Sequence, residues 1–332
     1  MMTMARELTA RFSSRGAIRR NSLSQLMQRL TSYLLFSTLS TDERARGRKT
    51  MKTQSPDTSL DAELVLIGMI RKAPMTRRFA FVQSWTASML EAGSQYMQQL
   101  HPQATDEDAR LLFIERQYGK ELTDKLRQTL HMYDIHVADT SDYWEAVRPL
   151  VNTCKDLDIP YALSGSLASS LYGMQRATLQ IDVVADLRQQ HLLSFCDYLS
   201  PQYLLHREEV EAAIQQQTSF ALVHLESLLK VVVTLPGMLA LGRRMFHRVR
   251  EAVLVEREQS IPVLAPEQVI VLLLDAFKRS NERADDLWYD LLGVLKVQGT
   301  DLDMPFLAQQ AAVLDITELL KRALVDAGLK DA

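Results

Sequence analysis

The residues best suited to chemistry gather in the middle of the chain, between Gly165 and Asp182. Gly165-Ser166 ends a short apolar run, and Arg176-Ala177-Thr178 leads into a second apolar stretch that contains Asp182. We expect a strand, a helix of about two turns and then a second strand. Gly165 lets the backbone approach a bound group, Ser166 can donate a hydroxyl hydrogen bond, and the helix N-terminus offers free N–H groups to an anion. Gly-Ser alone is also an ordinary strand-to-helix turn, but its register with Arg176, Thr178 and Asp182 favours a phosphate-binding ancestry.

This order of residues resembles the nucleotidyltransferase superfamily, which has a polymerase-beta-like fold, and especially its minimal and AbiEii-type bacterial members. Their pattern is Gly-Ser or Gly-Gly, a short helix, Gly-x-x-Arg-x-Thr and then Asp-x-Asp. The similarity runs from about residue 160 to about residue 328. Its later landmarks are Phe220 to Glu226, the strand Lys230 to Val233, Ala265-Pro266-Glu267, and Trp288-Tyr289-Asp290 with the residues to Lys296.

The resemblance implies a reaction and a set of site residues. The reaction is Mg²⁺-dependent transfer of a nucleoside monophosphate from an NTP to RNA, protein or a small hydroxylated acceptor, with a toxin–antitoxin or defence context for the family. Asp182 would be the catalytic, metal-binding carboxylate. The nucleotide and its phosphates would lie at the positions that match the rest of the motif, namely Gly165, Ser166, Arg176, Thr178 and Lys230.

The sequence departs from this pattern where the metal ions should bind. The family needs two carboxylates at i and i+2, which share one face of a strand, and a third on the neighbouring strand. Asp182 matches the second, but Gln180 stands at the first position and Val232 at the third, while Leu273 replaces a lysine usual in this branch. Mg²⁺ requires oxygen ligands, and valine supplies none. Asp186 and Glu226 are the alternative acids that could complete the set of three metal-binding carboxylates.

Two hypotheses follow from these departures. The first is a nucleotidyltransferase-family protein with impaired or lost catalysis. The second is a pseudoenzyme that acts as a nucleotide-binding module, or that binds a protein partner through its helical domains. Under the second, Arg176 would serve only as an ion-pair partner of Asp182, and Asp290 would cap or bridge the C-terminal helices. His206, His224 and His247 lack the spacing of a metal site or a catalytic pair and are interpreted as structural or solvated.

The elements around this motif predict an α+β fold. We expect a small all-helical domain over residues 56–130, with helices near 58–72, 76–100, 106–117 and 119–130, and a linker over residues 131–141. Residues 142–265 should form a nucleotidyltransferase-like domain with a mixed sheet and flanking helices. Its strands are predicted at Tyr161 to Leu163, Leu179 to Ala185, Phe220 to Leu225, Leu229 to Leu235, Ala252 to Val255 and Ile261 to Leu264. Residues 266–330 should form a C-terminal helical bundle.

Charge divides the chain unevenly. Residues 1–52 carry 11 basic and 3 acidic side chains, a net charge of +8, which leaves −11 for the remainder of a chain whose total is −3. The acidic body argues against non-specific nucleic-acid binding. We predict a basic, disordered extension over residues 1–52. The favoured interpretation is upstream sequence that adds nothing to the fold, with Met51 as the start of the ordered protein; the alternatives are a transit peptide and a membrane-surface helix.

Cysteine content and hydropathy bear on the cellular location. The chain holds two cysteines, Cys154 and Cys196, which cannot form a disulfide framework and have no metal-ligand spacing. No apolar run reaches the roughly 20 residues that cross a bilayer. We therefore expect a cytoplasmic protein with reduced thiols and no transmembrane segment.

Overall fold

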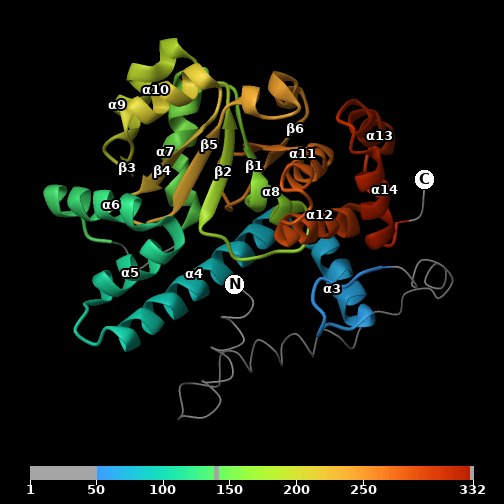
Figure 1. Ribbon diagram of the computed structural model, residues 1–332, viewed down its shortest axis with the longest axis horizontal. Helices are drawn as coiled ribbons and strands as arrows, with labels where there is room; N and C mark the ends of the chain where they lie inside the picture. Colours follow the sequence, from blue (N-terminus) through green and yellow to red (C-terminus); the bar gives the residue numbers. More distant parts are fainter. Residues whose placement is uncertain (1–50, 138–141, 330–332) are drawn as a thin grey trace. The chain divides into compact units, whose positions relative to one another are not determined.

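A computed structural model describes residues 51–137 and 142–329. The predicted extension over residues 1–50 therefore lies outside the described residues. From residue 51 onward, the described chain belongs to one compact unit. It combines α-helices with one seven-stranded sheet, which confirms the predicted α+β class (Figure 1). No helix within 51–137 or 142–329 is long and apolar enough to span a membrane.

The described part of the chain begins with four helices that local signals define. α3 (Leu60–Lys72) starts at the Ser59 cap, and α4 (Met75–Leu100) starts immediately after Pro74. α5 (Asp106–Tyr118) opens on a reciprocal capping box between Thr105 and Asp108, which satisfies two otherwise free N–H groups. Gly119, with φ of +90°, separates α5 from α6 (Lys120–Tyr133). α6 thus extends three residues into the predicted linker, of which 138–141 lie outside the described residues.

These helices lie against the rest of the unit. α3 packs against α12 (Asp285–Gln298), and α4 packs against α8 (Gly165–Tyr172). Arg71 of α3 donates hydrogen bonds to the last carbonyls of α12, those of Lys296 and Val297. A cation at this position opposes the partial negative charge of a helix C-terminus, and so fixes α3 to the C-terminal helices.

The sheet is mixed, with strand order β3-β4-β5-β2-β1-β7-β6. β2 is parallel to β5, and β1 is parallel to β7, while the other neighbouring pairs are antiparallel. The strands are β1 (Tyr161–Ser164), β2 (Gln180–Ala185), β3 (Tyr203–Leu204), β4 (Ser219–His224), β5 (Lys230–Thr234), β6 (Val249–Ala252) and β7 (Ile261–Leu264). The three central strands β5, β2 and β1 carry the predicted site.

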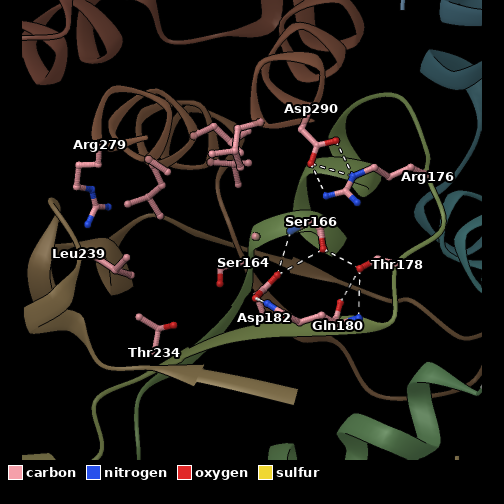
Figure 2. A pocket seen from close by; sticks show the side chains of 16 residues that line it. Ser164, Ser166, Arg176, Thr178, Gln180, Asp182, Thr234, Leu239, Arg279 and Asp290 are labelled. Atoms are coloured by element: carbon pink, nitrogen blue, oxygen red, sulfur yellow. Dashed lines mark hydrogen bonds and ion pairs between the residues drawn. The ribbon is translucent and has the colours of Figure 1, made fainter. Parts of the chain in front are cut away.

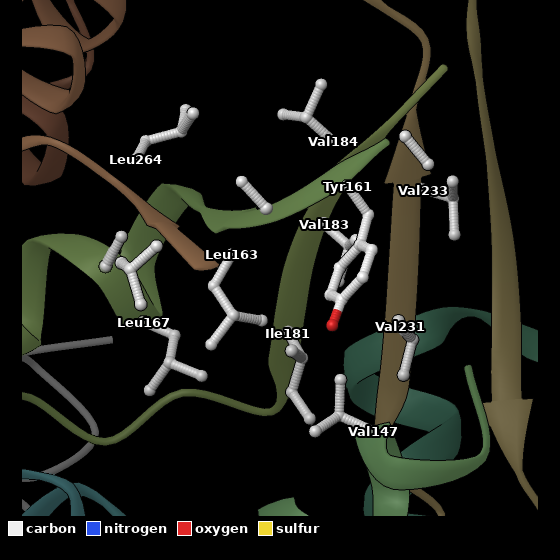
Figure 3. Packing of buried hydrophobic residues seen from close by; sticks show 14 of the residues in the cluster. Val147, Tyr161, Leu163, Leu167, Ile181, Val183, Val184, Val231, Val233 and Leu264 are labelled. Carbon is white, nitrogen blue, oxygen red and sulfur yellow. The ribbon is translucent and has the colours of Figure 1, made fainter. Parts of the chain in front are cut away.

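Alternation along the central strands separates the core from the site. Ile181, Val183, Val231 and Val233 are fully or almost fully buried and point toward α7 (Tyr143–Asp156), whose Val147 lies near them (Figure 3). The intervening residues Gln180, Asp182, Lys230, Val232 and Thr234 are only partly buried. Because side chains alternate between the two faces of a strand, these five share the opposite face. One apolar face thus anchors the sheet and leaves the other for polar chemistry.

Helices follow the strands on both sides of the sheet. α9 (Leu192–Leu199) and α10 (Arg207–Gln216) pack with α7 and β4 on one side, as Figure 1 shows. After β7 come four helices within residues 266–330, where the sequence predicts helices: α11 (Pro266–Arg279), α12, α13 (Met304–Val313) and α14 (Thr317–Asp326). α8 contacts both α11 and α12, so the motif helix lies between the sheet and the C-terminal helices.

Besides the longer α6, three features differ from the sequence prediction. The strand expected at Ala252 to Val255 is instead β6 over Val249–Ala252, because an edge strand with one neighbour tolerates the exposed Arg250 and Glu251 that obscured it. The two-residue β3 was missed, since it is too short to show a period. Met51 and Lys52 contact the body, although the predicted extension included them: Lys52 N donates to Asp326 O over 2.8 Å.

Candidate functional site

A cavity of about 390 Å³ opens on the polar face of the sheet, between β2, α8 and the C-terminal helices (Figure 2). Gly165 and the Arg176–Asp290 pair line it as well, and Arg279 lies on the opposite side from that pair in Figure 2. The polar wall consists of Ser164, Ser166, Thr178, Gln180, Asp182 and Thr234. The apolar wall consists of Leu239, Val269, Leu272, Leu273, Ala276 and Leu287. The structure thus brings together five of the predicted site residues, Gly165, Ser166, Arg176, Thr178 and Asp182.

Asp182 lies at the N-terminus of α8 and accepts hydrogen bonds there. Its Oδ2 accepts from the Ser166 backbone N–H at 3.2 Å and from the Ser166 hydroxyl at 3.4 Å. Gly165 has φ of +55°, and a Cβ built on it would collide with the Asp182 carboxylate. Glycine is therefore required by both conformation and space. The Ser166 N–H, one of the groups expected to meet a phosphate, is thus directed at a carboxylate of the chain itself.

Gln180 completes the hydrogen bonding of Asp182. Its amide Nε2 donates to Asp182 Oδ1, as the i, i+2 spacing on one strand face allows. Thr178 fixes the start of this strand, because its hydroxyl receives the Gln180 N–H at 3.2 Å and also lies 3.2 Å from the Ser166 hydroxyl. Asp182 is paired in register with Val232 of β5, which brings an isopropyl group to the neighbouring strand position.

Arg176 pairs with Asp290, and the predicted ion pair between Arg176 and Asp182 is wrong. Its Nε and Nη2 donate to the two carboxylate oxygens of Asp290 over 2.7 to 3.0 Å. Asp290 is 8% exposed. Burial alone would lower the pKa of the Arg176 guanidinium, but the hydrogen bonds and charge of Asp290 raise it above the ordinary value. The pair ties the segment before β2 to α12, and Nη1 of Arg176 takes no part in it.

Lys230 is outside the cavity lining, although the resemblance places it at the nucleotide. It is paired in register with Gln180, and its ammonium lies 5.0 Å from the centre of the Tyr118 ring. Partial burial lowers the pKa of Lys230, and the negative charge of Asp182 opposes that change. Lys230 therefore contributes positive charge next to the site and stacks on α5, without facing the cavity directly.

Neither alternative acid supplies the missing metal ligands. Asp186 follows the end of β2 and is held by Arg188 and Arg243, at 2.6 and 2.9 Å. These two arginines lower the pKa of its carboxyl, despite burial that favours the neutral form. Glu226 is exposed in the turn between β4 and β5. Within residues 51–137 and 142–329, no three His, Cys, Asp or Glu side chains are placed to hold a metal ion.

The remaining histidines and cysteines lie away from the cavity lining. His224 is buried and its Nδ1 lies 2.9 Å from the Ser227 hydroxyl, while Cys154 and Cys196 are buried free thiols. Sequence reasoning missed most of the apolar wall. The apolar wall on α11 does show a sequence pattern, because Val269, Leu272, Leu273 and Ala276 are spaced i, i+3, i+4 and i+7. The same spacing is found on any helix that packs one face against a hydrophobic core, so it does not reveal a cavity.

Comparison with known proteins adds little to this geometry. A search of protein-family models finds no match, and no curated protein matches the chain. Among solved structures, a similar chain is an antigenic nucleotidyltransferase-like protein from Paracoccidioides brasiliensis, at 14% sequence identity and a TM-score of 0.38. The match covers 57% of this chain and 93% of that one. A TM-score this low is no basis for assigning fold or function, so we rely on the cavity itself.

Proposed function

We propose that this chain is a nucleotidyltransferase-fold protein that has lost two-metal catalysis and keeps its cavity as a binding site for a small molecule. The state of Asp182 carries this proposal. Both of its oxygens already accept hydrogen bonds, from Ser166 on one side and from the Gln180 amide on the other. A carboxylate satisfied in this way has no need of a cation to balance it.

Mg²⁺ does not fit the residues that are present. A pair of Mg²⁺ ions needs a cluster of anionic oxygens to offset four positive charges. The described cavity wall offers one carboxylate that is not already paired with an arginine, Asp182, and the Gln180 amide donates one hydrogen bond to it. Val232 occupies the adjacent strand position. A metal ion here would have to break the hydrogen bond of the Gln180 amide and would gain no second carboxylate.

The proposal is tested by transfer and metal-binding assays on the full chain. The protein is incubated with each of the four NTPs, labelled at the α-phosphate, with Mg²⁺ or Mn²⁺ and total RNA or protein as acceptor. We expect no label on RNA, on protein or on the chain itself, and no heat of Mn²⁺ binding by calorimetry. Gln180→Asp combined with Val232→Asp should restore Mn²⁺ binding, and either change alone should do much less. Metal-dependent transfer by the wild type that is lost in Asp182→Asn would overturn the proposal.

A further inference from the structure

The polar wall of the cavity holds donors and acceptors that have no partner within the described chain. Gln180 uses one amide hydrogen on Asp182, which leaves Oε1 and a second hydrogen unpaired. Arg176 uses Nε and Nη2 on Asp290, which leaves Nη1. The hydroxyl of Ser164 forms no hydrogen bond to another side chain of the described residues and also lines the cavity. A ligand that satisfies this wall must offer both acceptors and donors along one edge.

The charges of the cavity cancel without any ligand. Arg176 is neutralised by Asp290 and Arg279 by Asp275 at 2.7 Å. The positive charge of Lys230, the register partner of Gln180, acts on Asp182 from β5. A triphosphate would bring several negative charges close to the Asp182 carboxylate, and both arginines of the described cavity wall are already paired with carboxylates. Like charges at short distance in a partly buried site are strongly unfavourable. The electrostatics therefore favour an uncharged ligand.

The apolar wall determines the shape of that ligand. Val269, Leu272, Leu273 and Ala276 form one face of α11 across from the sheet, and Leu239 and Leu287 extend it. Aliphatic side chains on one side and the polar strand face that carries Gln180 and Asp182 on the other suit a flat group held between them. A volume of about 390 Å³ lies toward the small end of ligand cavities.

From these three observations we infer that the cavity binds an uncharged planar heterocycle, of the size and hydrogen-bonding pattern of a nucleoside, without a metal ion and in preference to a nucleoside triphosphate. The Gln180 amide would read the polar edge of the ring, and the α11 face would cover its apolar surface. This inference rests on the proposed loss of metal chemistry, and it names the class of ligand that the retained cavity takes.

The experiment uses the full chain in EDTA and titrates adenosine, guanosine, cytidine and uridine separately, followed by ATP, GTP, CTP and UTP, with binding measured by calorimetry and thermal shift. We expect at least one nucleoside to bind saturably, and its triphosphate to bind roughly tenfold more weakly or worse. Ala276→Phe fills the cavity and should abolish binding. Gln180→Leu should weaken it roughly tenfold, because the polar edge of the ligand loses its partner. Gln216→Leu, an exposed glutamine on α10, is the matched control and should bind as the wild type does.

The outcomes separate this inference from the proposed function. No nucleoside binding up to millimolar concentration, with no label transfer, overturns the inference and leaves the loss of catalysis standing. Tighter binding of a triphosphate than of its nucleoside in EDTA also overturns it. Binding that survives Ala276→Phe would place the ligand elsewhere and refute the assignment to this cavity. Mg²⁺-dependent triphosphate binding together with label transfer would refute both.

Discussion

The hydrogen bond from Gln180 to Asp182 leads to a sharp prediction about charge. Gln180→Glu keeps the shape of the side chain but places an oxygen where the amide nitrogen now donates to Asp182 Oδ1. Losing a hydrogen bond to a charged group costs roughly 1.5–3 kcal/mol. Two charges about 4 Å apart at an effective dielectric constant of about 20 repel by about 4 kcal/mol, which we halve to about 2 because the cavity is open to solvent. The variant should therefore be about 4 kcal/mol less stable than the wild type at pH 8.

This loss should depend on pH with a defined sign. Repulsion raises the pKa of the introduced carboxyl above its unfolded value of about 4.3, so the folded variant binds a proton that the unfolded chain releases. The destabilisation is full above the raised pKa and diminishes as the pH falls through it, because the protonated carboxyl again donates to Asp182.

Urea unfolding at pH 8 and at pH 5 measures this difference, with Gln180→Leu as the control variant. Gln180→Leu loses the hydrogen bond without adding charge, so its cost of about 2 kcal/mol should change little between the two pH values. Equal stability of Gln180→Glu and the wild type at pH 8 would refute the reasoning. It would also be refuted if Mn²⁺ raised the melting temperature of the wild type, since Asp182 would then have capacity for a cation.

Three further perturbations test other contacts. Gly165→Ala should destabilise the chain by about 3 kcal/mol in urea unfolding, because its Cβ meets the Asp182 carboxylate at a positive φ; a neutral result would contradict the geometry. A chain that begins at Met51 should have the same melting temperature as the full chain. Removing residues 51–54 from that shorter chain should lower its melting temperature by several degrees, because buried Lys296 loses the Lys52 carbonyl and buried Glu63 loses the Gln54 N–H. Asp186→Asn should cost about 2 kcal/mol of unfolding free energy at pH 7 and should flatten the loss of stability below about pH 4. The reason is that arginines lower the folded-state pKa of this carboxyl, so its contribution to stability disappears as the pH falls through that value. If the melting temperature of the variant fell below pH 4 as steeply as that of the wild type, this account would be wrong.

Local signals predicted much of the fold and part of the site. Ser59, Thr105 and Gly119 lie at helix boundaries close to the expected ranges 58–72, 106–117 and 119–130. The i, i+2 spacing placed Gln180 and Asp182 on one strand face, where they do meet. Such rules act over a few residues, and within that range they were reliable for this chain.

Contacts between distant segments were not readable in the same way. Arg176 and Asp290 are 114 residues apart, and nothing local distinguishes that pairing from the one first expected with Asp182. The apolar wall on α11 becomes a cavity wall only because the sheet does not fill the space beside it. β6 was misplaced because its exposed arginine and glutamate follow from its edge position, which depends on the order of the whole sheet.

The hydrogen bonds of Lys296 to Lys52 and Glu63, which join the first and last parts of the described chain, have a consequence for biosynthesis. Buried Lys296 donates to the carbonyl of Lys52, which lies 244 residues earlier. A ribosome adding 5–20 residues per second needs roughly 12–50 s to synthesise that interval. During this time Glu63 and the apolar face of α3 have no partner from α12, and the cavity has no α11 wall. The nascent chain therefore exposes this surface throughout that interval, and the cavity can form only after α11 and α12 have left the ribosome.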